Sequence, residues 1–214
     1  VNNMLIDFAD LKPAQAYEWM SSLIVPRPIA WVSSVSRDGV PNLAPFSFFQ
    51  MVTSKPPTLL ICPLMGRGGT LKDTLENIRA TGEFVVNLAG PAQAQALNAS
   101  SATFDATVDE FAACGIVQVA SAHVAPPRVQ GAVASFECRL ARLEPYPPEA
   151  PSCHLVFGEV LVGHVDPALI GADGKLDPGR VDLLFRMGGE WYGSSGTSAA
   201  SPAWQPASTR ARLA

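Results

Sequence analysis

The chain has 214 residues, of which 16% are charged and 48% are apolar, with a formal net charge of −4 and a pI near 5.3. This composition is typical of a single well-buried globular domain and excludes a disordered chain. The acidic balance argues against a nucleic-acid binder, which needs a basic face. No apolar run reaches the ~18 residues of a membrane span, and no signal segment opens the chain, so a cytoplasmic protein without membrane contact is expected.

Four cysteines and three histidines give no sign of a disulfide framework or a metal site. They are Cys62, Cys114, Cys138, Cys153, His123, His154 and His164. The cysteines lack Cys-x-x-Cys spacing, so buried free thiols are expected. The histidines are too scattered to share a metal and are expected to be structural. No Gly-x-Ser-x-Gly motif is present, so a hydrolase has no support.

The first regular elements are predicted between residues 14 and 52. Residues 14–23 carry apolar side chains at near-helical spacing, and prolines follow, which predicts a short helix. Residues 29–36 are rich in β-branched and aromatic side chains, which favours a strand. Asp38-Gly39 is a favoured two-residue hairpin turn, and residues 40–52 are expected to return as one antiparallel strand.

A helix is predicted over residues 71–81. Thr70 precedes the periodic apolar positions and Asp73 follows three residues later, the pattern of a capping box at a helix N-terminus. Gly82 is expected to end the helix.

The remaining pattern is mostly that of strands. Strands are predicted over residues 58–62, 84–88, 116–119, 133–146 and 154–165, and short helices over 91–98 and 108–114. Because hairpins dominate and no βαβ alternation is present, the sequence predicts a six- or seven-stranded antiparallel Greek-key barrel with helices outside. We expect one domain over residues 1–193 and a Ser/Ala/Pro-rich tail over 194–214.

Gly66, Arg67, Gly68 and Gly69 form a basic, Gly-rich segment before the predicted helix that carries Lys72 and Thr74. Free backbone N–H groups, a helix N-terminus and two cations make such a place suited to a phosphate. The alternative is a surface turn with solvated charges. The segment matches neither a Walker A loop nor a Rossmann fingerprint, so nucleotide hydrolysis and a dinucleotide fold are disfavoured.

A second candidate site lies in the return strand, at Asn42-Leu43-Ala44-Pro45-Phe46-Ser47. Two prolines, Pro41 and Pro45, remove backbone donors and are expected to make the strand irregular. The freed backbone groups, together with Asn42 and Ser47, could bind the polar edge of a heteroaromatic ring. The alternative is an edge strand whose aromatic residues belong to the core.

Taken together, these segments resemble the flavin reductase-like family of FMN-binding split barrels. The resemblance is carried by PRPIAWVSSVSRDGVPNLAPFSFFQMVTSKPPTLLI (residues 26–61) and GTLKDTLENIRATGEFVVNL (69–88). It continues through ASFECRLARL (134–143), HLVFGEVLVGHVD (154–166) and RMGGEWY (186–192). The family includes reductase components of two-component monooxygenases and flavoredoxin-like proteins.

The resemblance implies a homodimer with FMN, or alternatively FAD, in a groove near the dimer interface. The residues it places around the cofactor are Trp31, Asn42, Ala44, Pro45, Phe46 and Ser47 at the ring and ribityl chain, and Arg67, Lys72, Asp73 and Thr74 at the phosphate end. A later element that resembles an active-site cover contains Arg186, Gly188, Gly189 and Tyr192.

The function that the resemblance implies is an NAD(P)H-dependent flavin reductase that passes hydride from a nicotinamide to flavin N5. Such chemistry belongs mostly to the cofactor and needs no general base, so the sequence names no catalytic residue. A partner monooxygenase is a candidate acceptor of the electrons. The alternatives are a non-catalytic flavin-binding or electron-transfer protein and a dimeric barrel without a ligand.

Overall fold

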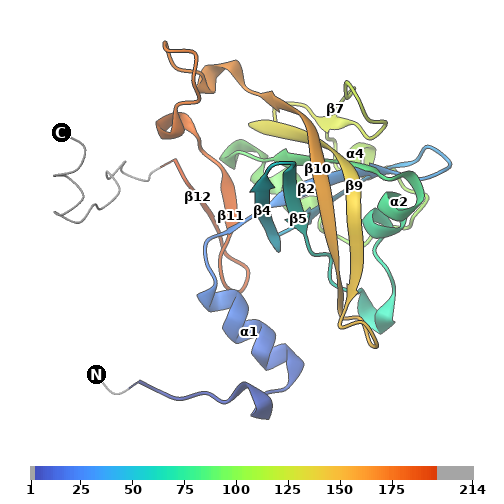
Figure 1. The fold of residues 1–214 in the computed structure, drawn as a ribbon, viewed down its shortest axis with the longest axis vertical. Coiled ribbons are helices and arrows are strands. Elements are labelled where there is room, and N and C mark those ends of the chain that lie inside the picture. Colours follow the sequence, from blue (N-terminus) through green and yellow to red (C-terminus); the bar gives the residue numbers. More distant parts are fainter. Residues whose placement is uncertain (1–2, 197–214) are drawn as a thin grey trace.

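A computed structural model describes residues 3–196, and residues 197–214, the larger part of the expected tail, lie outside this range. The main feature is a seven-stranded antiparallel sheet in the order β3-β2-β6-β9-β10-β5-β4 (Figure 1). Its strands are β2 (Ala30–Val35), β3 (Pro41–Phe46), β4 (Phe49–Ser54), β5 (Pro57–Ile61), β6 (Glu83–Leu88), β9 (Ala134–Tyr146) and β10 (Cys153–Val165). The mainly antiparallel β fold is confirmed.

Smaller elements surround this sheet. A three-stranded sheet in the order β1-β11-β12 combines β1 (Arg27–Pro28), β11 (Leu184–Arg186) and β12 (Tyr192–Ser194), and a two-stranded sheet combines β7 (Gln118–Val119) and β8 (Arg128–Val129). The α-helices are α1 (Pro13–Leu23), α2 (Asp73–Thr81), α3 (Ala94–Ala99) and α4 (Glu110–Ala113). Short 3-10 turns are η1 (Phe8–Asp10), η2 (Arg67–Gly69), η3 (Pro91–Gln93), η4 (Pro167–Leu169) and η5 (Pro178–Arg180).

The prediction of one continuous return strand over residues 40–52 was wrong. The chain leaves β3 at Phe46, and β4 begins at Phe49. β3 pairs with β2 and β4 pairs with β5, at opposite edges of the same sheet. The two halves of the predicted strand therefore border the opening of a split barrel.

The expected irregularity of β3 is also absent, because its pairing with β2 runs without a shift from Ala30↔Phe46 to Val35↔Pro41. Backbone N atoms of alternate residues point to the same side of a strand. The N–H of Leu43 donates to Glu110 rather than to β2, so Pro41 and Pro45 share its outward side. The prolines therefore remove donors from the free edge and not from the ladder, which discourages pairing with another strand.

Helix α2 begins two residues later than predicted. Its N-cap is Lys72, not Thr70, and the N-cap side chain makes no capping hydrogen bond. Gly66 N–H donates to Thr70 O at 2.8 Å, which closes the Gly-rich turn before the helix starts. The C-terminal prediction is confirmed, since Gly82 is left-handed with φ 74° and donates to Ile78 O.

Two clusters of buried apolar side chains lie on the two faces of β2. One contains Ala30 and Val32 and draws on β5, β6, β9, β10 and α2. The other contains Trp31 and draws on β3, α3, α4, β8 and β11. Because side chains alternate along a strand, β2 is covered on both faces, which explains its nearly continuous apolar sequence.

One of the three histidines, His164, has a structural contact with a buried carboxyl group, that of Glu137. Glu137 on β9 is fully buried and accepts hydrogen bonds from Ala122 N (2.7 Å) and His123 N (2.6 Å), and it lies 2.6 Å from His164 Nε2. Burial alone would raise the pKa of Glu137, but these hydrogen bonds outweigh it and lower the pKa. His164 thus helps to fix the loop after β7.

A glycine in β10 permits close packing in the core. A Cβ at Gly158 would lie 3.0 Å from Phe84 Cε1, closer still to Phe84 Cζ, and 3.3 Å from Cys138 Cβ. We expect Gly158→Ala to lower the free energy of unfolding by about 1–3 kcal/mol, because the Phe84 ring must move within a packed cluster. Urea denaturation measures this change.

The matched control is Gly163→Ala on the same strand, where a Cβ would meet Phe136 at an ordinary 3.5 Å. We expect it to change stability much less. Equal losses in the two variants would contradict the packing argument.

Candidate functional site

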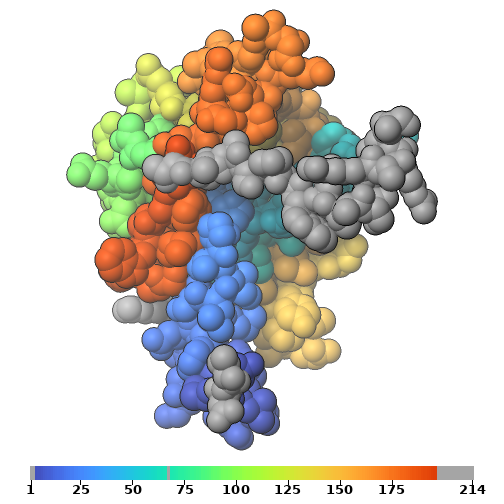
Figure 2. Space-filling view, turned by 90° about the vertical axis from the view of Figure 1, so that its left-hand side faces the viewer, coloured from blue at the N-terminus to red at the C-terminus, as the bar shows by residue number. Residues whose placement is uncertain are grey.

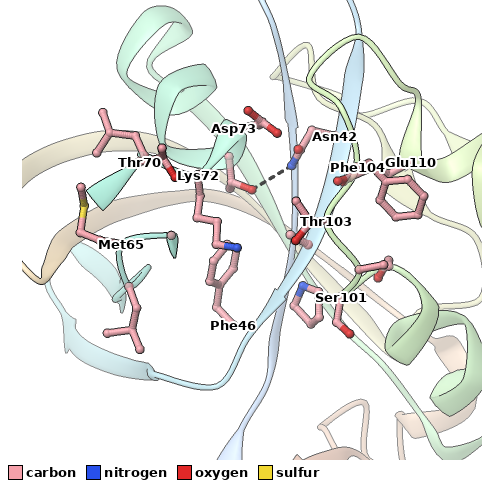
Figure 3. A pocket seen from close by; sticks show the side chains of 18 of the residues that line it. Asn42, Phe46, Met65, Thr70, Lys72, Asp73, Ser101, Thr103, Phe104 and Glu110 are labelled. Carbon is pink, nitrogen blue, oxygen red and sulfur yellow. Dashed lines mark hydrogen bonds between the residues drawn. The ribbon is translucent and has the colours of Figure 1, made fainter. Parts of the chain in front are cut away.

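A cavity of ≈ 1100 Å³ opens beside the split of the barrel (Figure 3). One wall is β3 and the residue after it, with Asn42, Ala44, Pro45, Phe46 and Ser47. A second wall is the segment from Cys62 to Thr74, which includes Lys72 and Asp73. A third wall comes from residues 100–106 and Glu110, and Tyr17 of α1 lies at the border. The structure thus brings eight of the predicted cofactor-binding residues together around one space.

A buried hydrogen bond joins the first two walls. Asn42 Nδ2 on β3 donates to Thr74 Oγ1 on α2 at 2.8 Å, and the two residues are 7% and 1% exposed (Figure 3). A buried polar pair that is satisfied in this way costs much to break. This hydrogen bond therefore fixes the position of the Asn42 segment relative to the Lys72–Thr74 segment, the two parts of the predicted site.

The charges around the cavity are mostly negative. Among the lining side chains that the structure describes, Lys72 carries the positive charge, and three carboxyl groups face the same space, those of Asp73, Asp105 and Glu110. The Arg67 side chain, predicted at the phosphate end, lies outside the described part of the structure. Of the described lining residues, Lys72 is therefore the group that can attract an anionic ligand.

Glu110, at the start of α4, is a site residue that the sequence did not indicate. It is 6% exposed and accepts a hydrogen bond from Leu43 N through Oε2. Burial raises the pKa of Glu110 to about 7, and the nearby Asp73 adds to this, while the Leu43 hydrogen bond and Lys72 oppose it. A carboxyl group with this pKa exchanges a proton near neutral pH.

The other two carboxyl groups differ from each other. Burial raises the pKa of Asp73, with Lys72 opposing and Asp105 and Glu76 adding to the rise. The pKa of Asp105 is lowered because its Oδ1 accepts hydrogen bonds from Thr107 N and Thr107 Oγ1, at 3.0 and 2.7 Å. Asp105 therefore stays ionised at neutral pH while Glu110 titrates.

The loop from Ser100 to Ala106 is also a wall that the sequence analysis missed. It contributes Ser101 and Thr103 hydroxyls and the Phe104 ring to the lining. The segment has no periodic pattern and lies between two short helices, so nothing in the sequence marked it. Only the packing of α3 and α4 against β3 brings it to the cavity.

Trp31 lies behind the cavity rather than in its lining. Its ring is fully buried in the second core cluster, and Nε1 donates to Ser100 Oγ at 2.9 Å. Ser100 does line the cavity. Trp31 therefore positions the loop that forms the third wall.

The predicted cover residues lie together in the β11–β12 hairpin but do not line the cavity. Arg186 stacks over the Tyr192 ring at 4.5 Å, and Gly188 packs against Ser22. Gly189 has φ 59°, in the turn of the hairpin. The hairpin contacts α3, just before the third wall, through Tyr192 Oη, which donates to Asn98 Oδ1 at 3.3 Å.

A buried arginine connects this hairpin to the cavity. Arg27 Nη2 donates to Met187 O at 2.9 Å and Nε donates to Ser47 Oγ at 3.5 Å. Arg27 is 6% exposed and also donates to the end of α1 at Ser21 O. Helix α1, the hairpin and the cavity wall thus meet at one guanidinium group.

The cysteines are free thiols, as predicted, but only Cys138 and Cys153 are buried, and Cys62 and Cys114 are partly exposed. Cys62 lines the cavity, where burial and a hydrogen bond with Cys153 raise the pKa of its thiol to about 12. A thiol with this pKa is not a nucleophile at neutral pH. Within residues 3–196 no group of three or more His, Cys, Asp or Glu side chains could hold a metal ion. None of the described helices is both long and apolar enough to span a membrane.

Comparison with known proteins identifies the family. The sequence model of the flavin reductase like domain matches residues 20–182, which is most of the chain. The chain belongs to the flavin reductase-like family. The fold is accordingly the FMN-binding split barrel that the sequence predicted, and the family binds flavin and includes NAD(P)H:flavin oxidoreductases.

Three similar proteins illustrate the relationship. An uncharacterized protein of Aquifex aeolicus is 36% identical over 176 residues, which are 82% of this chain and 88% of that protein. Nitrilotriacetate monooxygenase component B from Bacillus cereus is 29% identical with a TM-score of 0.87, covering 94% of this chain and 100% of that one. The 2-nitrobenzoate 2-nitroreductase NbaA from Pseudomonas fluorescens is 26% identical with a TM-score of 0.82, covering 95% and 98%.

The ionisation of Glu110 predicts how stability depends on pH. The folded protein holds the proton up to about pH 7, whereas the unfolded chain releases it near 4.5, so folding takes up a proton between these values. The contribution of Glu110 to stability therefore falls as the pH rises through this window and is constant above it. Gln at this position does not titrate and keeps an oxygen for Leu43 N–H.

We expect Glu110→Gln to be stabilised relative to the wild type by a margin that grows by about 1–3 kcal/mol between pH 5 and pH 8. Urea denaturation of the ligand-free protein at several pH values measures it. Glu149→Gln is the control, since Glu149 is exposed and lies outside the cavity lining. A margin for Glu110→Gln that does not change with pH would contradict the titration.

Proposed function

We propose that this protein is an NAD(P)H-dependent flavin reductase that binds FMN in the cavity beside β3. The observation that carries the proposal is the meeting of Asn42–Ser47 and Lys72–Thr74 on facing walls of one cavity, in a chain of the flavin reductase-like family. A volume of ≈ 1100 Å³ lies just above the usual range for small-molecule sites and leaves room for a second planar ring.

The donor set fits a phosphorylated flavin. Lys72 supplies a cation for the phosphate, and hydroxyls of Ser47, Thr74 and Thr103 suit the ribityl chain. Phe46 offers an apolar face to a flat ring, and Asn42 is already oriented by Thr74. The same donors suit FAD, whose additional nucleotide would extend out of the open side.

When bound, the flavin supplies the redox chemistry, in which N5 accepts a hydride from the nicotinamide. The residues of this chain bind and orient the two rings and exclude water from the contact. This chemistry requires no side chain to remove a proton from a substrate.

The acceptor of the electrons is proposed to be a partner monooxygenase. Support comes from the Bacillus cereus protein, which is named as a component of a monooxygenase and is 29% identical. The Pseudomonas fluorescens protein is named as a nitroreductase, so an aromatic nitro compound is the second candidate acceptor. A partner monooxygenase would receive its electrons from reduced flavin released by this protein. An aromatic nitro compound would be reduced within the cavity.

We also propose a homodimer that covers helix α1. This 11-residue helix buries only Ser21 and leaves apolar side chains exposed, with Leu23 at 70% and Met20 at 50%. Figures 1 and 2 show it projecting from the body of the molecule. A short helix that buries so little is not stable through contacts with its own domain. Because Tyr17 of α1 borders the cavity, a second copy on this face would adjoin the site.

The direct test is the visible spectrum of the purified protein and its oxidation of NADH and NADPH with and without FMN. We expect flavin absorbance or saturable FMN binding, and nucleotide oxidation that depends on FMN. A protein that neither binds FMN nor oxidises either nucleotide would refute the proposal. Reduction of bound FMN by dithionite but by neither nicotinamide would favour an electron-transfer protein.

Lys72→Ala tests the position of the phosphate. We expect FMN binding to weaken by about 1.5–3 kcal/mol, the scale of a charged hydrogen bond, as measured by fluorescence titration. Lys175→Ala is the control, because Lys175 is exposed on the loop after β10 and does not line the cavity. Equal affinity in wild type and Lys72→Ala would show that the phosphate lies elsewhere.

Leu23→Glu tests the dimer face. We expect the variant to be monomeric where the wild type is dimeric, since a charge would be buried against a second copy. Light scattering after size-exclusion chromatography gives the mass. The control is Leu176→Glu, which replaces a leucine of similar exposure, 52%, outside α1. A monomeric wild type, or a dimer that Leu23→Glu leaves intact, would refute the proposal that α1 lies in a dimer interface.

A further inference from the structure

The carboxyl group of Glu110 has one oxygen committed to the fold and one facing the cavity. Oε2 accepts from Leu43 N, whose neighbours Asn42 and Ala44 both line the cavity. Among the residues that the structure describes, the other oxygen, Oε1, takes no hydrogen bond, and Glu110 lines the cavity. Among the described residues, the buried side-chain atom without a partner is His154 Nδ1, so Oε1 of Glu110 is open to the cavity and can take a hydrogen-bond partner from there.

We propose that Glu110 couples proton binding to ligand binding: as a neutral acid it donates a hydrogen bond from Oε1 to a carbonyl-type oxygen of the bound flavin, and as a carboxylate it opposes binding. The inference rests on the proposed function, because it specifies how the same cavity responds to pH. Glu110 acts as a positioning and specificity residue and takes no part in hydride transfer.

Titratable and polar groups on three elements around Glu110 influence its charge. From α2, Asp73 faces Glu110 and disfavours its charge, while Lys72 favours it. From its own segment, Asp109 disfavours the charge, and Cys114 is the other titratable group nearby. From β3 comes the Leu43 N–H. Burial is the largest influence and already raises the pKa of Glu110 to about 7.

A bound ligand would strengthen the preference for the neutral acid in two ways. It would displace water from Oε1, which raises the cost of a charge there. It would also engage Lys72 with its phosphate, so that the cation that favours the carboxylate is neutralised. The cavity would then take up a proton when FMN binds above pH 7, where the free protein has lost it.

A different role for Oε1 predicts the opposite dependence on pH. An ionised Glu110 could accept a hydrogen bond from a ribityl hydroxyl, because carboxylates are strong acceptors. In that case FMN affinity would increase as the pH rises through 7. The sign of the pH dependence therefore separates the two roles.

The test compares the dissociation constant of FMN for wild type and Glu110→Gln between pH 5.5 and pH 8.5. Gln presents an N–H donor at every pH and keeps an oxygen for Leu43, so it imitates the neutral acid. Because the FMN phosphate titrates identically in both experiments, the ratio of the two constants isolates Glu110. We expect a constant ratio below pH 6 and a loss of wild-type affinity that approaches tenfold for each pH unit above 7.

Titration calorimetry in two buffers of different ionisation enthalpy counts the protons directly. At pH 8 we expect the wild type to take up close to one proton per FMN more than Glu110→Gln. Glu149→Gln, which makes the same chemical change at an exposed residue outside the cavity lining, should keep the wild-type uptake.

Each outcome has a definite meaning. The same pH dependence in wild type and Glu110→Gln, or wild-type affinity that rises relative to the variant with pH, overturns the coupling and leaves the proposed function standing. Absence of FMN binding in the wild type at every pH overturns the proposed function and the coupling with it.

Discussion

The free edge of β3 is the constraint on which the rest of the structure depends. Along its outer side Pro41 and Pro45 have no N–H, and the N–H of Leu43 is taken by Glu110 of α4. No strand can therefore extend the sheet here by ordinary pairing. The barrel therefore stays open between β3 and β4. The free edge of β3 forms one wall of the cavity instead of pairing with β4.

The polar contacts around this edge serve both stability and binding. Glu110 and Thr74 hold β3 through Leu43 N and the Asn42 side chain, from two different helices. Trp31 extends the arrangement through Ser100 to the loop that closes the third wall. The groups that satisfy buried donors are thus the same groups that shape the cavity, so the site is formed before a ligand arrives.

This arrangement suits chemistry that the cofactor performs. A flavin reductase needs two rings held in contact and a phosphate held in place, and a rigid, polar wall achieves both. It also explains why one carboxyl group in the cavity matters. With a pKa near 7 beside a strand that would contact the flavin, Glu110 is placed to make binding sensitive to pH within the physiological range.

The sequence by itself determined the family, the antiparallel barrel, the long β9–β10 hairpin and eight residues of the cavity, because these follow from local periodicity and from collinear motifs. It placed the start of α2 two residues early and joined β3 to β4. Only the tertiary structure decided these points and revealed Glu110, since residues 40–52 read locally as one strand and Glu110 as an ordinary first-turn residue. Burial arises from the packing of α4 against β3, and packing between distant segments leaves no local pattern.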